Sequence, residues 1–221
     1  MKPITRYVSL TALLLMIALL LPQAASAAPT LITVDSAGAG ETSLALDASG
    51  NPVISYTKSD SLLLAVCNDP ICGNLTLTTV DNTSNTGFQS SLALDGSGNP
   101  VIGYFDPGNS DLRLAVCNDP TCSSPTLTTV DSLGGASPSL VLDSSGNPVI
   151  SYIAGGVLRL ALCDDPTCSS PTLTDVDFFN RESPSLVLDA SGNPVIRYYD
   201  DTNDDLRLAL IKYTTDRADT V

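Results

Sequence analysis

One motif recurs four times along the chain, and its spacing constrains the fold more than any other feature. The motif is S-L-x-L-D-x-S-G-N-P-V-I-x-Y, and its aspartates are Asp47, Asp95, Asp143 and Asp189. These aspartates lie 48, 48 and 46 residues apart. A period of this size is typical of supersecondary units that stack and bury their apolar surfaces against one another. The spacing therefore predicts four repeated units.

The second unit shows the expected content of one repeat. Apolar runs at 91–94 and 100–104 flank a turn rich in Gly and Asn, which is the pattern of a β-hairpin. Further apolar and β-branched runs at 112–117 and 126–130 predict a third and a fourth strand. No sustained helical periodicity follows the N-terminal region. The sequence thus predicts an all-β protein of four-stranded antiparallel units.

The fourth unit contains only three predicted strands, at 186–188, 195–199 and 206–213. Segment 30–35, T-L-I-T-V-D, has the sequence of a fourth strand although no other strand precedes it. Pairing of this segment with 206–213 would close the sheets into a ring without free edges. Closed rings of four-stranded sheets are β-propellers, so we expect a four-bladed β-propeller closed by its N-terminal strand. A partial ring completed by a second chain is the alternative.

The six cysteines form three close pairs, each of which brackets an Asp-Pro turn between the third and fourth predicted strands. The pairs are Cys67 and Cys72, Cys117 and Cys122, and Cys163 and Cys168. A disulfide across so short a loop would close the hairpin covalently and contribute about 2 kcal/mol in the chain-entropy model. Zinc binding is the alternative, but thiols of a secreted chain are oxidised, which favours disulfides.

The first 27 residues have the features of a secretory signal peptide. Lys2 and Arg6 precede an apolar run at 8–21, and Ala25-Ser26-Ala27 forms a cleavage motif. A membrane anchor is the alternative, although the apolar run is short for a span. We therefore expect a secreted protein, extracellular or periplasmic, with a single propeller domain over 28–221. The first strands of its four repeats are expected near 43–47, 90–95, 139–143 and 185–189.

The chain is strongly acidic, with a formal net charge of −14 and no histidine. A surface of this sign repels nucleic acid and anionic membranes. The partners expected are therefore an extracellular protein or a glycan, and the chain is expected to be a monomer or a small homo-oligomer.

The repeat, extended to D-L-R-L-A-x-C-x-D-P-x-C, resembles repeats of secreted bacterial proteins of unknown function. Those repeats look like β-propeller blades and are distantly similar to sialidase-type and kelch-type propellers. The resemblance covers 30–213 and implies a propeller of stacked blades. It implies nothing about an activity.

Several residues that could serve catalysis recur once per unit, which indicates a structural role. They are Arg113, Arg159 and Arg207, and Tyr56, Tyr104, Tyr152 and Tyr198. Glycosidases use paired carboxylates, but Glu41 and Glu182 are the only glutamates, and no histidine can activate a nucleophile. We therefore expect a non-catalytic binding or scaffold propeller. A sialidase-like or other carbohydrate-active propeller is the alternative.

The segments that join the second strand to the third, and one unit to the next, differ between units. Variable loops on a constant scaffold are where function is most often placed, and these two sets of loops would share one face. The ligand-binding residues expected there are Phe105, Asp106, Phe178, Phe179, Arg181, Tyr199 and Asp200.

One loop concentrates acidic residues, namely Asp200, Asp201, Asp204 and Asp205. Oxygen ligands at alternating positions suit calcium, although the loop lacks the EF-hand pattern and a solvated turn competes with this interpretation. The expectation is therefore that the protein has no cofactor. Calcium at this loop, in a calcium-dependent adhesion module, is the second alternative.

Overall fold

The computed structural model describes residues 29–36, 38–178 and 181–212, and all regular structure in these ranges is β-strand. The predicted signal peptide lies outside the described residues. The described strands belong to one compact unit, Ile32–Val221. Within the described ranges, no helix is long and apolar enough to cross a membrane.

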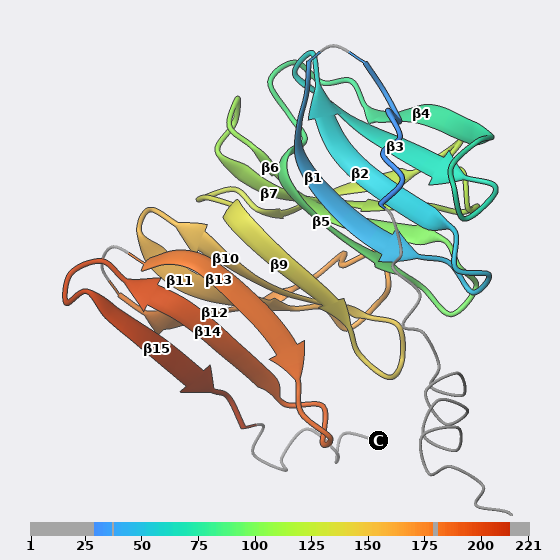
Figure 1. Ribbon diagram of the computed structural model, residues 1–221. Coiled ribbons are helices and arrows are strands. Elements are labelled where there is room, and N and C mark those ends of the chain that lie inside the picture. Colours follow the sequence, from blue (N-terminus) through green and yellow to red (C-terminus); the bar gives the residue numbers. More distant parts are fainter. Residues whose placement is uncertain (1–28, 37, 179–180, 213–221) are drawn as a thin grey trace, which may run out of the picture. The chain divides into compact units, whose positions relative to one another are not determined.

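The described strands form four antiparallel sheets, here called blades 1 to 4 (Figure 1). Blade 1 consists of β1 (Ala39–Leu46), β2 (Pro52–Lys58), β3 (Ser61–Cys67) and β4 (Leu75–Asp81). Blade 2 consists of β5 (Phe88–Leu94), β6 (Pro100–Asp106), β7 (Asp111–Val116) and β8 (Thr126–Asp131). Blade 3 consists of β9 (Ala136–Leu142), β10 (Pro148–Ala154), β11 (Val157–Leu162) and β12 (Thr172–Asp177). Blade 4 consists of β13 (Arg181–Leu188), β14 (Pro194–Asp200) and β15 (Asp205–Leu210). In every blade the strands pair in chain order.

The motif that repeats in the sequence forms the turn between the first two strands of each blade. In blade 1, the Asp47 carboxylate accepts hydrogen bonds from the backbone N–H groups of Ser49 and Asn51, each at 2.8 Å. Gly50 has a φ of 82°, a conformation that glycine adopts without a Cβ penalty. The same pattern of bonds recurs in the other three blades. The repeated D-x-S-G-N sequence is therefore explained by local turn chemistry.

The three predicted disulfides are present, and each closes the turn between the third and fourth strands of blade 1, 2 or 3. They join Cys67 to Cys72, Cys117 to Cys122, and Cys163 to Cys168, with Cα–Cα distances of 4.7 to 4.8 Å. Disulfides persist in oxidising compartments, which agrees with the predicted secretion. In blade 2 the Asp119 carboxylate also orders this turn, because it accepts hydrogen bonds from the backbone of Thr121 and Ser123.

The first strand of each blade begins two to four residues earlier than the sequence pattern predicts. The reason is a β-bulge, which interrupts the alternation of apolar and polar residues. The register shifts near Glu41, Gln89, Ser137 and Ser183, all of which have positive φ values between 36° and 51°. The bulges lie at one repeat position, two residues before the start of the motif.

The prediction of antiparallel, propeller-type blades is confirmed, but closure of the ring is not observed. β15 pairs with β14, and no other described strand pairs with β15. The segment expected to fill this place, 30–35, forms no strand. Residues Ile32 to Asp35 instead line a hollow with residues of β1 and β2 in blade 1. β15 also ends at Leu210, earlier than the 206–213 strand predicted from the sequence.

Candidate functional site

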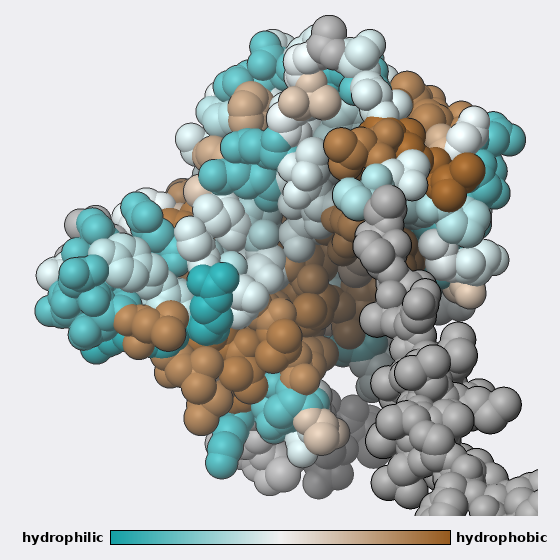
Figure 2. Space-filling model, viewed as in Figure 1, coloured by the Kyte–Doolittle hydropathy of each residue, from teal (hydrophilic) through white to brown (hydrophobic). Residues whose placement is uncertain are grey.

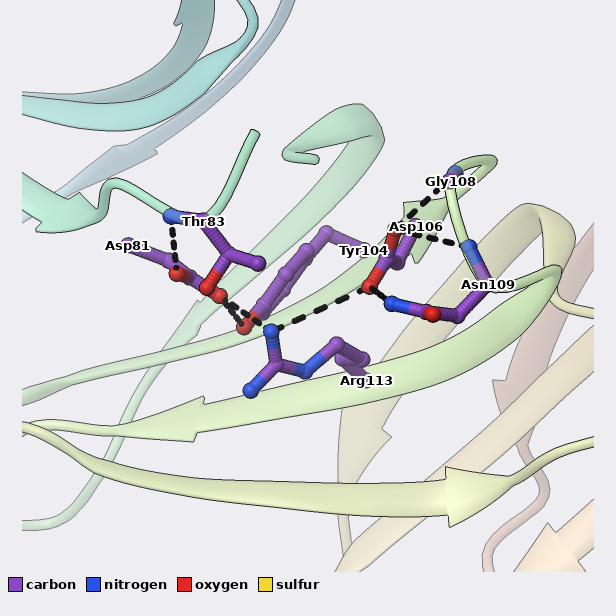
Figure 3. Close-up of polar contacts among 7 residues, drawn as sticks. All are labelled: Asp81, Thr83, Tyr104, Asp106, Gly108, Asn109 and Arg113. Carbon is purple, nitrogen blue, oxygen red and sulfur yellow. Dashed lines mark hydrogen bonds and ion pairs between the residues drawn. The ribbon is translucent and has the colours of Figure 1, made fainter. Parts of the chain in front are cut away.

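A buried polar network connects blade 1 to blade 2 (Figure 3). The Asp81 carboxylate, at the end of β4, accepts hydrogen bonds from the Tyr104 hydroxyl and from Arg113 Nη1, both at 2.7 Å. The backbone N–H of Thr83 donates to the same carboxylate at 2.9 Å. Burial alone would raise the pKa of Asp81, but these hydrogen bonds outweigh it and hold the pKa below its ordinary value. Burial, together with the hydrogen bond to Asp81, raises the pKa of Tyr104.

The same network recurs at each junction between blades. Tyr152 and Arg159 donate to Asp131, and Tyr198 and Arg207 donate to Asp177. At the start of the chain, Tyr56 and Lys58 donate to Asp35. The recurring tyrosines and arginines therefore contact structural aspartates, as the sequence repeat indicates.

Two adjoining hollows form the candidate ligand site, because they combine side chains of neighbouring blades and include two carboxylates. The first has a volume of about 520 Å³ and is lined by Gln89, Ala136, Ser137, Ile153, Gly156, Glu182, Ser183 and Asp201. The second has a volume of about 340 Å³ and is lined by Phe105, Ser110, Leu133, Gly134, Gly135, Ala136, Ile153, Gly155 and Gly156. Ala136, Ile153 and Gly156 line both hollows. Together they place a polar, acidic hollow beside an apolar, aromatic one.

The β-bulges bring polar side chains to the first hollow and link one blade to the next. The backbone N–H of Gln89 donates to Glu41 Oε2 at 2.7 Å, and that of Ser137 donates to Gln89 Oε1 at 2.8 Å. The equivalent positions hold Glu41, Gln89, Ser137 and Ser183, so this position changes in chemistry while the adjacent motif does not. The sequence interpretation missed these residues. A signal was present in the sequence, because the residue two positions before the motif is always polar but differs between repeats.

Glycines shape the second hollow by permitting close approach of the backbone. A Cβ on Gly134 would lie 2.5 Å from Ala154 Cα, and Gly134 has a φ of 144°. The loop that precedes β9 therefore packs directly on the end of β10. Phe105, which lies near the end of β6, completes the wall of this hollow and is half-buried.

The structure brings only part of the predicted ligand-binding set to these hollows. Phe105 lines the second hollow, whereas Phe178 is exposed to solvent. The Tyr199 hydroxyl donates to Asp204 Oδ1 at 2.7 Å, which raises the pKa of Tyr199 to about 12. The Arg181 backbone pairs with Asp200 across β13 and β14. Phe179 lies outside the described residues.

Two predicted ligand-binding aspartates are instead buried at the ends of second strands, where each orders the turn to the third strand. Asp106 accepts hydrogen bonds from the Gly108 N–H at 3.0 Å and from Asn109 Nδ2 at 2.9 Å (Figure 3). Asp200 accepts from the Thr202 N–H at 3.1 Å and from Asn203 Nδ2 at 2.9 Å. These bonds give both carboxylates a role within their own loops.

The calcium hypothesis for the acidic loop finds no geometric support in the described part of the chain. Among those residues, no group of three or more acidic, cysteine or histidine side chains is arranged to hold a metal ion. Asp200 is directed inward, and its carboxylate also lies 3.4 Å from Arg207 Nε. Asp201 lines the first hollow, while Asp204 and Asp205 are exposed. Calcium binding by this loop stays a prediction.

No protein-family model matches the chain, and no curated protein matches it in sequence. Solved structures do resemble it. One is a bifunctional GH43-CE protein of Bacteroides eggerthii, with 15% identity and a TM-score of 0.52 over 79% of this chain and 28% of that chain. Another is a GH43 β-1,3-galactosidase, with 12% identity and a TM-score of 0.50 over 77% of this chain and 41% of that chain. The chain spans less than half the length of either protein, and the likeness shows a propeller-type fold.

These neighbours correct the main functional expectation. The sequence favoured a non-catalytic binding or scaffold propeller, but the fold is shared with GH43 propeller enzymes. The expectation relied on the periodicity of the arginines and tyrosines and on the scarcity of glutamate. It left out the bulge position, where the residue changes from Glu41 and Gln89 to Ser137 and Ser183. The finding favours the alternative, a carbohydrate-active propeller.

Proposed function

We propose that this protein is a carbohydrate-active propeller that hydrolyses a glycan bound across the two adjoining hollows. The observation that carries the proposal is that two carboxylates, Glu182 and Asp201, line one hollow, and the aromatic ring of Phe105 lines the hollow beside it. Ligand sites are typically apolar hollows with a few converging polar groups. The propeller fold of the GH43 neighbours supports the reaction class.

The two carboxylates of the first hollow suit the chemistry of glycoside hydrolysis. One carboxyl group protonates the leaving oxygen, and the other acts as nucleophile or activates a water molecule. Glu182 and Asp201 are both exposed, so a bound glycan can reach both carboxyl groups.

The remaining lining residues suit recognition of a sugar. Gln89, Ser137 and Ser183 supply amide and hydroxyl groups that hydrogen-bond to sugar hydroxyls. Phe105 offers an aromatic surface on which the C–H face of a pyranose or furanose ring can pack. In this proposal the hydrogen bonds of the first hollow orient the sugar, and the apolar contacts of the second hollow contribute most of the binding affinity.

Hydrolysis of β-1,3-galactan and of a panel of nitrophenyl glycosides by the purified chain tests the proposal. We expect release of sugar, and a loss of about 100-fold or more in kcat for Glu182→Gln and Asp201→Asn. Phe105→Ala should raise KM about tenfold with a smaller effect on kcat, because it removes binding that ground state and transition state share. Ser145→Ala, in an exposed turn of blade 3, is the matched control and should leave the rate unchanged.

Absence of hydrolysis across the whole panel would contradict the proposal. Equal activity of the native chain and of Glu182→Gln and Asp201→Asn would place the reaction at other residues. Circular dichroism of each variant separates a lost activity from a lost fold.

A further inference from the structure

Each internal junction between blades is built from the same two faces. The trailing face belongs to the earlier blade and is centred on a leucine of its third strand, and the leading face belongs to the next blade and is centred on a leucine of its first strand. The pairs are Leu64 with Leu92, Leu114 with Leu140, and Leu160 with Leu186. Their exposed fractions are 0%, 0% and 1% for the trailing leucines and 8%, 6% and 3% for the leading ones.

A repeated hydrogen bond fixes how these faces meet. The backbone N–H of Leu92 donates to Ser43 Oγ at 3.0 Å, across the junction of blades 1 and 2. The N–H of Leu140 donates to Ser91 Oγ at 2.9 Å, and that of Leu186 donates to Ser139 Oγ at 3.0 Å. The junction is thus both apolar and specific in register.

One leading face and one trailing face are left uncovered at the ends of this array. Leu44, the leading leucine of blade 1, is 62% exposed, and Leu208, the trailing leucine of blade 4, is 60% exposed. Leu206, Leu210 and Val187 are exposed beside Leu208, and Figure 2 shows apolar side chains on the surface of blade 4. An exposed strand edge that carries leucines favours association with another chain.

Segment Ile32–Asp35 has the sequence of the fourth strand that blade 4 lacks beside β15. Its sequence, I-T-V-D, corresponds to T-T-V-D at the end of β8. Asp35 binds Tyr56 at 2.8 Å and Lys58 at 2.7 Å, just as the last residue of β8 binds the tyrosine and arginine of blade 3. The segment therefore meets blade 1 as the fourth strand of a preceding blade would. By the register in which Leu114 pairs with Thr128, Ile32 would pair with Leu208.

We propose that two copies of the chain assemble head to tail, with the trailing face of blade 4 on the leading face of blade 1 of the other copy. Ile32–Val34 of the incoming copy then pairs with the outer edge of β15. All three internal junctions join a trailing face to a leading face, and one face of each kind, at Leu208 and at Leu44, stays exposed in the same molecule. A second copy of the chain offers the complementary face to each of them. The dimer contains two identical contacts of this kind. They cover the exposed faces of both copies and thereby close the assembly.

Cysteines placed at the expected pair test this arrangement. The double variant Ile32→Cys, Leu208→Cys is oxidised, and its mass is measured on a non-reducing gel and by light scattering. We expect a disulfide-linked species of twice the mass of one chain, whereas Ile32→Cys alone should give none. A monomer with an internal bridge, identified by intact mass after alkylation, would show closure within one chain and overturn the proposal. A monomer without a bridge would overturn it as well.

A surface variant gives an independent measurement without new cysteines. Leu208→Arg should reduce the solution mass of the assembly twofold, because it replaces the central leucine of the contact with a second charge beside Arg197, the cross-strand partner of Leu208. Leu173→Arg is the matched control, since Leu173 is 41% exposed on β12 of blade 3, outside both uncovered faces. Equal masses for the native chain, Leu208→Arg and Leu173→Arg would contradict the proposal. Near-ultraviolet circular dichroism verifies that each variant is folded.

Discussion

At the scale of single residues, the aspartate that ends each fourth strand is the main polar connection between blades. Asp81 is buried, and it accepts hydrogen bonds from a tyrosine and an arginine of the next blade. A buried carboxylate is costly unless its hydrogen bonds are made. Asp35 makes the equivalent bonds with Tyr56 and Lys58 at a more exposed site, where the Lys58 side chain is 28% exposed.

The difference between these two sites gives a prediction for matched substitutions. Tyr104→Phe should lower the free energy of unfolding by about 1–3 kcal/mol, because it removes a donor from a buried charged acceptor. Tyr56→Phe should cost less, since water can replace the lost hydroxyl at Asp35. Urea denaturation of both variants measures the difference. If both substitutions lowered the free energy of unfolding equally, burial of the aspartate would not determine the size of the effect.

At the scale of elements, the turns between third and fourth strands combine a disulfide with an aspartate that binds the loop backbone. Hydrogen bonds from Ser123 and Thr121 lower the pKa of Asp119 to about 2, and those from Thr167 and Ser169 lower the pKa of Asp165 to about 2. A carboxyl group with a depressed pKa stabilises the fold above its unfolded pKa, near 3.8. This stabilisation is lost as the pH falls toward 2.

Asp119→Asn should therefore destabilise the protein at pH 7 and progressively less as the pH is lowered from 4 to 2. The reason is that the native carboxylate becomes protonated in this range and then loses its advantage over the amide. Denaturation midpoints of the native chain and the variant at several pH values measure the effect. A gap between the two midpoints that is constant with pH would refute this role of Asp119.

At the scale of the whole molecule, the contacts are those of a repeat array in which each blade packs on its neighbours. Such arrays depend on nearest-neighbour junctions, and their terminal units need a cap or a partner. Blades 1 and 4 each carry one uncovered apolar face, in contrast to the buried faces of blades 2 and 3. The proposed head-to-tail contact would form a fourth junction of the same type, which the blades of one chain do not form in this structure.

Such a contact makes thermal stability depend on concentration. We expect the Tm of the native chain to fall on dilution, because dissociation is favoured and the unpaired faces lose their partner. The Tm of Leu208→Arg should be independent of concentration. Calorimetry over a hundredfold range of protein concentration checks this. An unchanging Tm for the native chain would argue against a reversible assembly.

The sequence by itself determined the parts of this protein that follow from local rules. The D-x-S-G-N turns, the strands and the cysteine pairs depend on residues within a few positions of one another, so they could be read along the chain. The role of the recurring tyrosines and arginines followed from the same periodicity. The strand starts were misplaced because β-bulges at Glu41, Gln89, Ser137 and Ser183 interrupt the alternating pattern.

Only the tertiary structure decided which residues of different blades meet. Glu182 and Asp201 reach one hollow with Gln89, and Asp106 and Asp200 are turned inward, because packing and bulges set the direction of each side chain. The sequence showed that segment 30–35 resembles a fourth strand, but its place depends on the angle at which packed blades follow one another. That angle arises from contacts between residues nearly 50 positions apart, and no local pattern encodes it.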